Sequence, residues 1–226
     1  MLAVVTMEFS PEARPVGEIT IPRMVNYARR CGADFIVRSV RVRPEIPIYW
    51  ERLALADLFG LYERILILDL DVLVRADAPN LFDIVPADHV GMANEGQTLG
   101  DPEKALRNAN IQAYHVHLDL PYYGWNGRYY NVGVMLVPRV GRALLDIPDD
   151  LWHGHWNEQC LISGRIHHQG TAVFDIGSQF NYMQAFDPGL IRCLDAYMIH
   201  YAGRGIMEHK THIIMGDDQA WRKHQL

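Results

Sequence analysis

A chain of 226 residues can bury a full hydrophobic core without disulfides or structural metal, and one domain is its simplest organisation. Apolar residues make up 49% and charged residues 21%, which excludes disordered, collagen-like and coiled-coil proteins. The 21 Lys and Arg against 27 Asp and Glu give a net charge of -6 without any basic block, so a nucleic-acid partner is not expected.

The cysteines and the N-terminus bear on the cellular compartment. Cys31, Cys160 and Cys193 lie far apart without CxxC spacing, which is typical of reduced thiols in a cytosol. The N-terminus has no basic segment before its short apolar run. No stretch approaches the roughly 18 apolar residues that cross a bilayer. We therefore expect a cytoplasmic protein without a transmembrane segment.

The first third of the chain alternates strand-like and helical patterns. The β-branched run 3–6 is typical of a strand, and the Pro- and Gly-containing segment 10–17 predicts a loop after it. Apolar residues then recur at helical spacing, with Pro22 in the predicted first turn and Gly32 as the stop. A strand at 33–38, a helix over 50–61 and an apolar strand at 65–68 follow.

Later segments predict further strands at 90–93, 132–137, 173–176 and 197–201, with a short helix within 151–164. The segment 95–130 has weak periodicity and predicts an excursion over the sheet edge. Its aromatic residues either form the core of that excursion or stack against a sugar. They are Tyr122, Tyr123, Trp125, Tyr129 and Tyr130.

The order of these elements predicts an α/β fold. A strand that is apolar at every position, such as 65–68, is buried on both faces, which is typical of a mainly parallel sheet between helices. Ligands of such sheets bind at the carboxyl ends of the strands. The end of this strand is therefore the place to look for a site.

The most informative motif, Asp69-Leu70-Asp71, lies at that strand end. Two carboxylates two residues apart repel each other unless a cation lies nearby. Hard oxygen ligands of this kind suit Mg²⁺ or Mn²⁺ carrying a substrate phosphate. Taken alone, the motif is equally typical of a capped turn with solvated aspartates.

The segment 62–74 around this motif resembles the DxD segment of the GT-A nucleotide-sugar glycosyltransferases, most closely glycosyltransferase family 8, the glycogenin-like enzymes. Three more segments resemble motifs of that family in the same order: 130–136 (YNVGVML), 157–162 (NEQCLI) and 199–203 (IHYAG). The resemblance covers residues 6–204. It implies a GT-A, Rossmann-like fold in one domain spanning 1–226, with a mainly parallel central sheet flanked by helices.

The resemblance also implies residue roles. Asp69 and Asp71 would engage a metal ion and the donor ribose, and His200 would supply a third metal ligand through a ring nitrogen. The nucleotide diphosphate would contact the strand ends and the second helix, at Thr6, Arg52, Leu70 and Gly203. The transferred sugar would be lined by Asn131, Glu158 and Gln159.

Three features depart from the family pattern. Glu158 stands where the family usually has Asp, so its carboxylate is displaced by one methylene. Leu70 is bulkier than the usual small residue between the aspartates. The family's basic residue after the H-x-x-G segment is out of register, and its possible replacements are Arg204, His209 and Lys210.

These features predict a Mn²⁺- or Mg²⁺-dependent glycosyltransferase that moves a sugar from a nucleotide diphosphate, expected to be a UDP-sugar, to a hydroxyl of a glycan or similar acceptor. The resemblance implies retention of anomeric configuration, and leaves open which group, if any, is the nucleophile.

Two alternatives remain at the level of sequence. Residues 68–71 also resemble the nucleophile strand of haloacid-dehalogenase-like phosphatases, and 213–218 their late acidic motif, although the DxD strand is third rather than first. A sugar-nucleotide-binding module without turnover is the other alternative.

Overall fold

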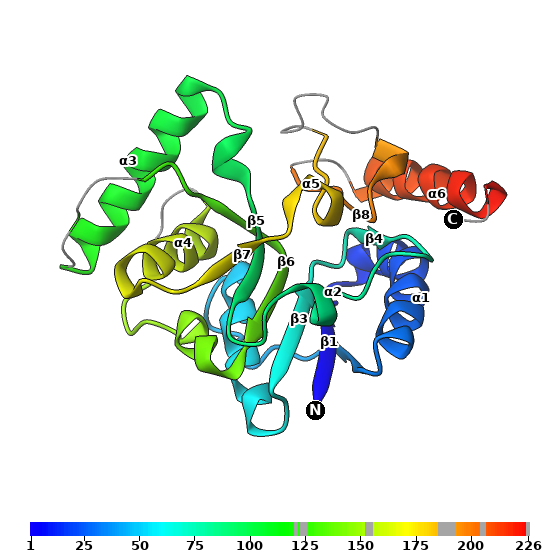
Figure 1. Ribbon diagram of the computed structural model, residues 1–226, viewed down its shortest axis with the longest axis horizontal. Coiled ribbons are helices and arrows are strands. Elements are labelled where there is room, and N and C mark those ends of the chain that lie inside the picture. Colours follow the sequence, from blue (N-terminus) through cyan, green and yellow to red (C-terminus); the bar gives the residue numbers. More distant parts are fainter. Residues whose placement is uncertain (120–121, 123–125, 152–155, 185–192, 204–206, 225–226) are drawn as a thin grey trace.

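The structure is a computed structural model and describes residues 1–119, 122, 126–151, 156–184, 193–203 and 207–224 (Figure 1). Its strands are β1 (Leu2–Met7), β2 (Asp34–Arg38), β3 (Arg64–Leu68), β4 (Val72–Val74), β5 (Val90–Asn94), β6 (Tyr130–Pro138), β7 (Val173–Asp175) and β8 (Met198–His200). Its α-helices are α1 (Arg14–Arg30), α2 (Leu81–Ile84), α3 (Asp101–His117), α4 (Asn157–Gln169), α5 (Gly177–Phe180) and α6 (Met207–Lys223). Its 3₁₀ helices are η1 (Pro11–Ala13), η2 (Ile48–Gly60), η3 (Glu95–Gln97), η4 (Arg139–Leu145) and η5 (Cys193–Asp195).

The central sheet has the strand order β2-β1-β3-β6-β5-β7. Strand β1 is parallel to both β2 and β3, and β5 is parallel to β7, whereas β6 is antiparallel to its two neighbours. Five of the six strands therefore run in one direction. The predicted α/β fold with a mainly parallel sheet is confirmed, and β6 is its one reversed strand.

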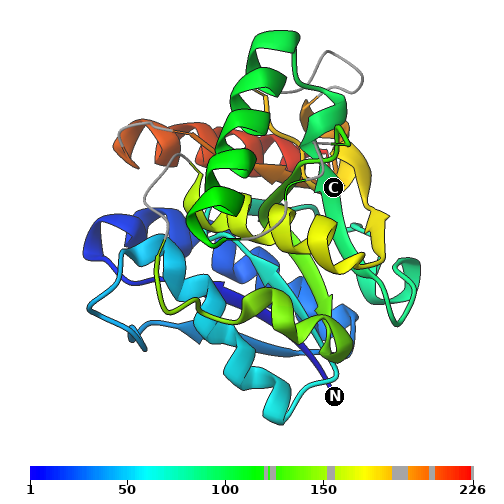
Figure 2. The same ribbon diagram turned by 90° about the vertical axis from the view of Figure 1, so that its left-hand side faces the viewer.

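Helices cover both faces of this sheet (Figures 1 and 2). On one face, Ile67 of β3 belongs to the same buried cluster as Trp50 of η2 and Leu161 of α4. On the other face, Leu66 clusters with Met24 of α1. Every residue of β3 is buried because both its faces are covered, as its uninterrupted apolar run predicts.

A second sheet of two antiparallel strands, β4 and β8, lies beside the first. The strand predicted at 197–201 is present as β8, but its partner β4 was not predicted. Helix α6 packs against α1, and its Ile214 and Trp221 join a buried cluster with Leu73 and Ile199 of this sheet. The small sheet thus brings the last described part of the chain beside the end of β3.

Several predicted helix boundaries were wrong. Helix α1 begins at Arg14 inside the predicted loop, with Pro15 in its first turn and Pro22 in its interior. Residues 48–60 form a 3₁₀ helix rather than an α-helix. Helix α4 begins at Asn157, inside the predicted range, but extends beyond that range to Gln169. Proline suits the first turn of a helix because the N–H groups there have no partner within the helix. Pro15, not Pro22, therefore marks the start of α1.

The predicted excursion 95–130 contains the 17-residue helix α3. Its buried face includes Arg107, Asn110 and His115, so the hydrophobic period was too weak to indicate a helix. Tyr129 and Tyr130 are buried core residues, whereas Tyr123 and Trp125 lie outside the described residues. In the described part of the chain, no helix combines the length and apolarity that crossing a membrane requires.

Candidate active site

Asp69, Asp71 and His200 come together where β3 ends and β8 ends. The Nε2 atom of His200 lies 3.4 Å from an oxygen of Asp69 and 3.5 Å from an oxygen of Asp71. One potential ligand atom from each residue lies within 4.8 Å of the others. The structure therefore brings together the three residues that the resemblance implied as metal ligands.

Backbone pairing explains why they meet. The amide of Asp69 donates to the carbonyl of Gly133 on β6 at 2.8 Å, and the amide of Val72 donates back to the carbonyl of Asp69 at 3.0 Å. The chain therefore turns tightly between β3 and β4. The register of β4 and β8 then pairs Val72 with His200.

The ring of His200 lies directly against the backbone of Gly133. A Cβ atom at position 133 would lie only 2.1 Å from Cε1 of the ring, so only glycine leaves room for it. Nδ1 of His200 lies 3.1 Å from Oδ1 of Asn181, whose amide nitrogen donates to Asn131. Because that Oδ1 can only accept, a neutral ring carries its proton on Nδ1 and presents the Nε2 lone pair to the carboxylates.

Two cations neutralise the aspartates in this structure. Arg52 of η2 lies 2.5 Å from Asp69, and Lys210 of α6 lies 2.7 Å from Asp71. Burial alone would raise the pKa of Asp69, but Arg52 and His200 hold it well below its ordinary value. Burial likewise opposes protonation of His200, yet the two carboxylates raise its pKa above the ordinary value.

This donor set fits a divalent metal ion. Two carboxylates and an imidazole with its lone pair directed toward them supply the oxygen and nitrogen ligands that Mn²⁺ accepts, and the oxygens also suit Mg²⁺. Asp69 and Asp71 are partly exposed, with side-chain exposures of 24% and 17%, so a ligand can reach them.

A cleft of about 690 Å³ opens over these residues. Its lining includes every residue that the resemblance assigned to the transferred sugar and the metal. These are Asp69, Asp71, Asn131, Glu158, Gln159 and His200. Gly203 and Lys210 line it as well.

A network of amides and one carboxylate extends from the metal-ligand candidates into this cleft. The amide nitrogen of Asn131 lies 3.2 Å from Glu95 and 3.3 Å from the side-chain oxygen of Gln159. Gln159 in turn donates to Glu95 at 3.3 Å. Arg107 of α3 binds the other oxygen of Glu95 at 2.7 Å. The polar groups beside the cleft are therefore held in fixed positions.

Glu158 lines the cleft, and its surroundings differ from those of the metal-ligand candidates. Burial raises the pKa of its carboxyl group, an effect that the charge of Arg52 opposes. Glu158 therefore adds a second kind of carboxyl group to the cleft, more readily protonated than Asp69.

Three other residues that the resemblance assigned to the nucleotide are Thr6, Leu70 and Gly203, and of these Gly203 lines the cleft. Thr6 lies at the end of β1, fully buried, and its hydroxyl has no hydrogen-bond partner among the described residues. Leu70 packs with the buried cluster around α6 and the small sheet, while its carbonyl accepts a hydrogen bond from Thr20. Gly203 lines the cleft in a left-handed conformation, with φ of +119°. Neither Thr6 nor Leu70 is among the cleft-lining residues.

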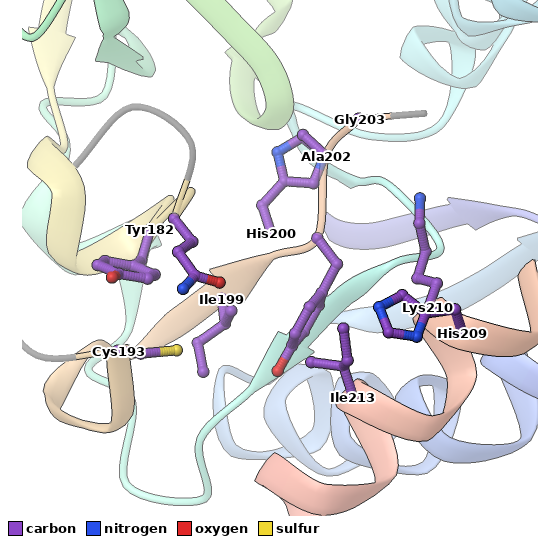
Figure 3. A pocket seen from close by; sticks show the side chains of 11 residues that line it. Tyr182, Cys193, Ile199, His200, Ala202, Gly203, His209, Lys210 and Ile213 are labelled. Carbon is purple, nitrogen blue, oxygen red and sulfur yellow. The ribbon is translucent and has the colours of Figure 1, made fainter. Parts of the chain in front are cut away.

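A second cavity of about 370 Å³ lies on the other side of β8. Figure 3 shows Tyr182 and Cys193 on one side of it, and His209, Lys210 and Ile213 of α6 on the other. Of the three candidates for the missing basic residue, Lys210 lines both cavities and binds Asp71, whereas His209 lines only the smaller one. Arg204 lies outside the described residues.

Sequence reasoning missed Glu95, Arg107 and Asn181. A signal was available for Glu95, because it lies two residues after the strand predicted at 90–93 and thus near a carboxyl strand end. Arg107 lies on the missed helix α3. Asn181 follows the short helix α5, and no motif indicated it.

The acidic residues required by the phosphatase alternative lie elsewhere. Asp217 and Asp218 belong to helix α6, not to a strand end. Asp217 accepts a hydrogen bond from Tyr201 at 2.7 Å, and Asp218 binds Arg23 and Arg222, both at 2.7 Å. The structure therefore does not bring them to Asp69, and this part of the alternative was wrong.

Comparison with known proteins gave matches among solved structures. No protein-family model matches the chain. No curated protein matches it. A glycosyltransferase involved in glycosylation of the major capsid of PBCV-1 is 14% identical and superposes with a TM-score of 0.60, covering 95% of this chain and 98% of its own. The galactosyltransferase LgtC, in complex with donor and acceptor sugar analogs, is 14% identical with a TM-score of 0.59, covering 96% and 95%. The glycosyltransferase GlyE of Streptococcus pneumoniae TIGR4 is 13% identical with a TM-score of 0.58, covering 100% and 65%.

These structures share the arrangement of the central sheet and its flanking helices with this chain. The first two are matched along nearly their whole length. The chain therefore has the GT-A fold of these glycosyltransferases, as the four sequence motifs implied.

Proposed function

We propose that the chain is a metal-dependent glycosyltransferase that transfers a sugar from a nucleotide diphosphate donor to a hydroxyl of an acceptor. The observation that carries this proposal is the convergence of Asp69, Asp71 and His200 at a cleft of about 690 Å³ in a GT-A fold. The UDP-sugar donor and retention of configuration rest on the sequence resemblance alone.

The metal ligands would be Asp69, Asp71 and His200. A bound Mn²⁺ or Mg²⁺ supplies Lewis-acid neutralisation of the diphosphate leaving group, an effect worth several kcal/mol. Arg52 holds Asp69 in place through its ion pair and a hydrogen bond to the carbonyl of Val132. Asn181 holds His200 in the tautomer that can bind a metal.

Lys210 is our choice for the basic residue that holds the diphosphate. Its ammonium group already lies beside a carboxylate of the site, 2.7 Å from Asp71, and it lines the cleft. A phosphate entering there would offer it another anionic partner. Helix α6 would thereby be linked to the donor.

The transferred sugar would lie against Asn131, Glu158 and Gln159. The two amides are oriented by Glu95, which leaves them suited to binding sugar hydroxyls. Glu158 adds a carboxyl group to this part of the cleft, and we propose that it lies near the anomeric carbon.

A donor screen tests the function. The wild-type chain is incubated with UDP-, GDP- and ADP-sugars, with Mn²⁺ or with EDTA, and release of the nucleotide diphosphate is measured. We expect slow, Mn²⁺-dependent hydrolysis of a UDP-sugar. A binding module would show stabilisation by UDP and Mn²⁺ without turnover. Turnover of a phosphomonoester abolished by Asp69→Asn would support the phosphatase and contradict the proposal.

The pH dependence of donor binding tests the role of His200. Protons and metal compete for its Nε2, and the carboxylates of Asp69 and Asp71 raise its pKa above the ordinary 6.5. Mn²⁺-dependent UDP affinity should therefore fall as pH decreases from 8 to 6, approaching about tenfold per pH unit below that pKa. The UDP phosphate titrates in the same range, so the measurement is the difference in slope between wild type and His200→Gln.

Asp217→Asn is the matched control for this experiment, since Asp217 is a carboxylate of α6 that binds Tyr201 rather than the metal-ligand candidates. It should bind UDP and Mn²⁺ like wild type at every pH. If His200→Gln binds like wild type while Asp217→Asn loses the metal, the assignment of the site is wrong.

A further inference from the structure

Trp156, which the sequence motifs did not indicate, has an unusual backbone. Its φ of 50° and ψ of 46° lie in the left-handed region, where bulky residues are rarely found. It directly precedes helix α4, whose first turn carries Glu158 and Gln159. Such strain is typically retained where the side chain is needed in one direction.

The ring of Trp156 stacks on a guanidinium group that is itself fixed. The Cζ atom of Arg107 lies 3.3 Å from the ring centroid of Trp156 and 4.9 Å from that of Tyr129. Arg107 is almost fully buried and binds Glu95, the carboxylate that orients Asn131 and Gln159. Position and orientation of the indole ring are thus tied to the network that lines the cleft.

The same ring remains accessible from the cleft. Trp156 is 37% exposed and lines the cleft together with Leu106 and Glu158. A series of contacts joins this ring to the metal-ligand candidates. It runs from His200 through Asn181, Asn131, Glu95 and Arg107 to Trp156. The network therefore links the metal-ligand candidates at one end to an aromatic ring at the other.

We propose that Trp156 is a stacking surface for a sugar ring of the acceptor, and hence that the acceptor is a saccharide or glycoside. This rests on the proposed function, in which the donor diphosphate lies beside the metal-ligand candidates and the transferred sugar at Asn131 and Gln159. Pyranose rings present flat C–H faces that pack on aromatic rings, while their hydroxyls bind polar groups. A ring already fixed by Arg107 loses little conformational freedom when a sugar packs on it.

The test uses two variants of Trp156. Trp156→Phe keeps an aromatic ring, whereas Trp156→Asn removes it and places there a residue that tolerates the left-handed backbone. Val116→Ala, at an exposed residue of α3, is the matched control. Methyl glucosides and galactosides, lactose, maltose and cellobiose serve as acceptors with the donor that wild type hydrolyses, and their binding is measured in parallel by saturation-transfer NMR.

We expect Trp156→Asn to raise the KM for the best saccharide by about tenfold or more, while Trp156→Phe stays within about threefold of wild type. Every kinetic constant should be unchanged in Val116→Ala, and the effect of Trp156→Asn should fall on the saccharide KM much more than on Mn²⁺-dependent UDP affinity. A merely structural ring would instead change the saccharide KM and the UDP affinity of Trp156→Asn by similar factors.

Failure of this inference can be told apart from failure of the proposed function. If wild type binds UDP with Mn²⁺ but neither binds nor glycosylates any saccharide of the panel, the stacking surface is refuted and the transferase proposal is not. Equal saccharide KM values for wild type and Trp156→Asn also refute it. If wild type binds no nucleotide but Trp156→Asn loses NMR contact with a saccharide, the stacking surface is supported and the donor assignment is wrong.

Discussion

Replacing Asp71 by Asn should lower Mn²⁺-dependent UDP affinity by about a hundredfold or more, because a neutral amide is a poor ligand for a divalent metal. The fold should be nearly unaffected. Asp71 is partly exposed and loses its ion pair with Lys210 and its contact with His200, so the free energy of unfolding should change by no more than about 1 kcal/mol. Calorimetric titration of UDP with Mn²⁺ and urea unfolding measure the two quantities.

The matched control is Asp77→Asn, at an exposed aspartate that binds Arg75 outside the cleft. It should change neither UDP affinity nor its dependence on Mn²⁺. A folded Asp71→Asn protein that keeps wild-type Mn²⁺-dependent affinity would show that Asp71 is not a metal ligand.

The substitution Gly133→Ala should be nearly as damaging as removal of His200. The added methyl group would lie 2.1 Å from the imidazole ring, well inside contact distance, so the ring has to leave its position. We expect the loss of most Mn²⁺-dependent UDP binding, about a hundredfold, and a loss of about 1–3 kcal/mol in the free energy of unfolding from overpacking.

Gly216→Ala provides the comparison, because position 216 lies inside helix α6 and a Cβ there meets nothing within 4 Å. That variant should keep UDP affinity and gain up to about 1 kcal/mol of stability from helix propensity. Wild-type UDP affinity in Gly133→Ala would mean that His200 does not need its observed position to bind the donor.

Much of the fold and the metal-ligand candidates could be predicted from local sequence. The uninterrupted apolar run of β3 indicated a strand buried on both faces, and its position in the chain placed Asp69 and Asp71 at a ligand-binding edge. His200 came from a resemblance that spans four separate motifs. Its contact with Asp69 depends on the pairing of β4 with β8, which no local pattern indicated.

The second half of the cleft could not be predicted, and the reason is physical. Helix α3 buries Arg107 and Asn110, so its inward face lacks the apolar period by which helices are recognised. Arg107 is tolerated in the interior because Glu95 pairs with it at 2.7 Å and Tyr129 and Trp156 flank it. Polar interiors of this kind are specified by contacts between distant segments, and those contacts appear only in the folded chain.

The most direct measurement of the central claim is a titration of UDP into the wild-type chain at pH 7.5, first with Mn²⁺ and then with EDTA in its place. If Asp69, Asp71 and His200 hold a metal that binds the donor diphosphate, UDP binds at one site with Mn²⁺ and loses most of its affinity with EDTA, and inorganic phosphate does not compete at equal concentration. Equal affinity for UDP with and without the metal would contradict the account.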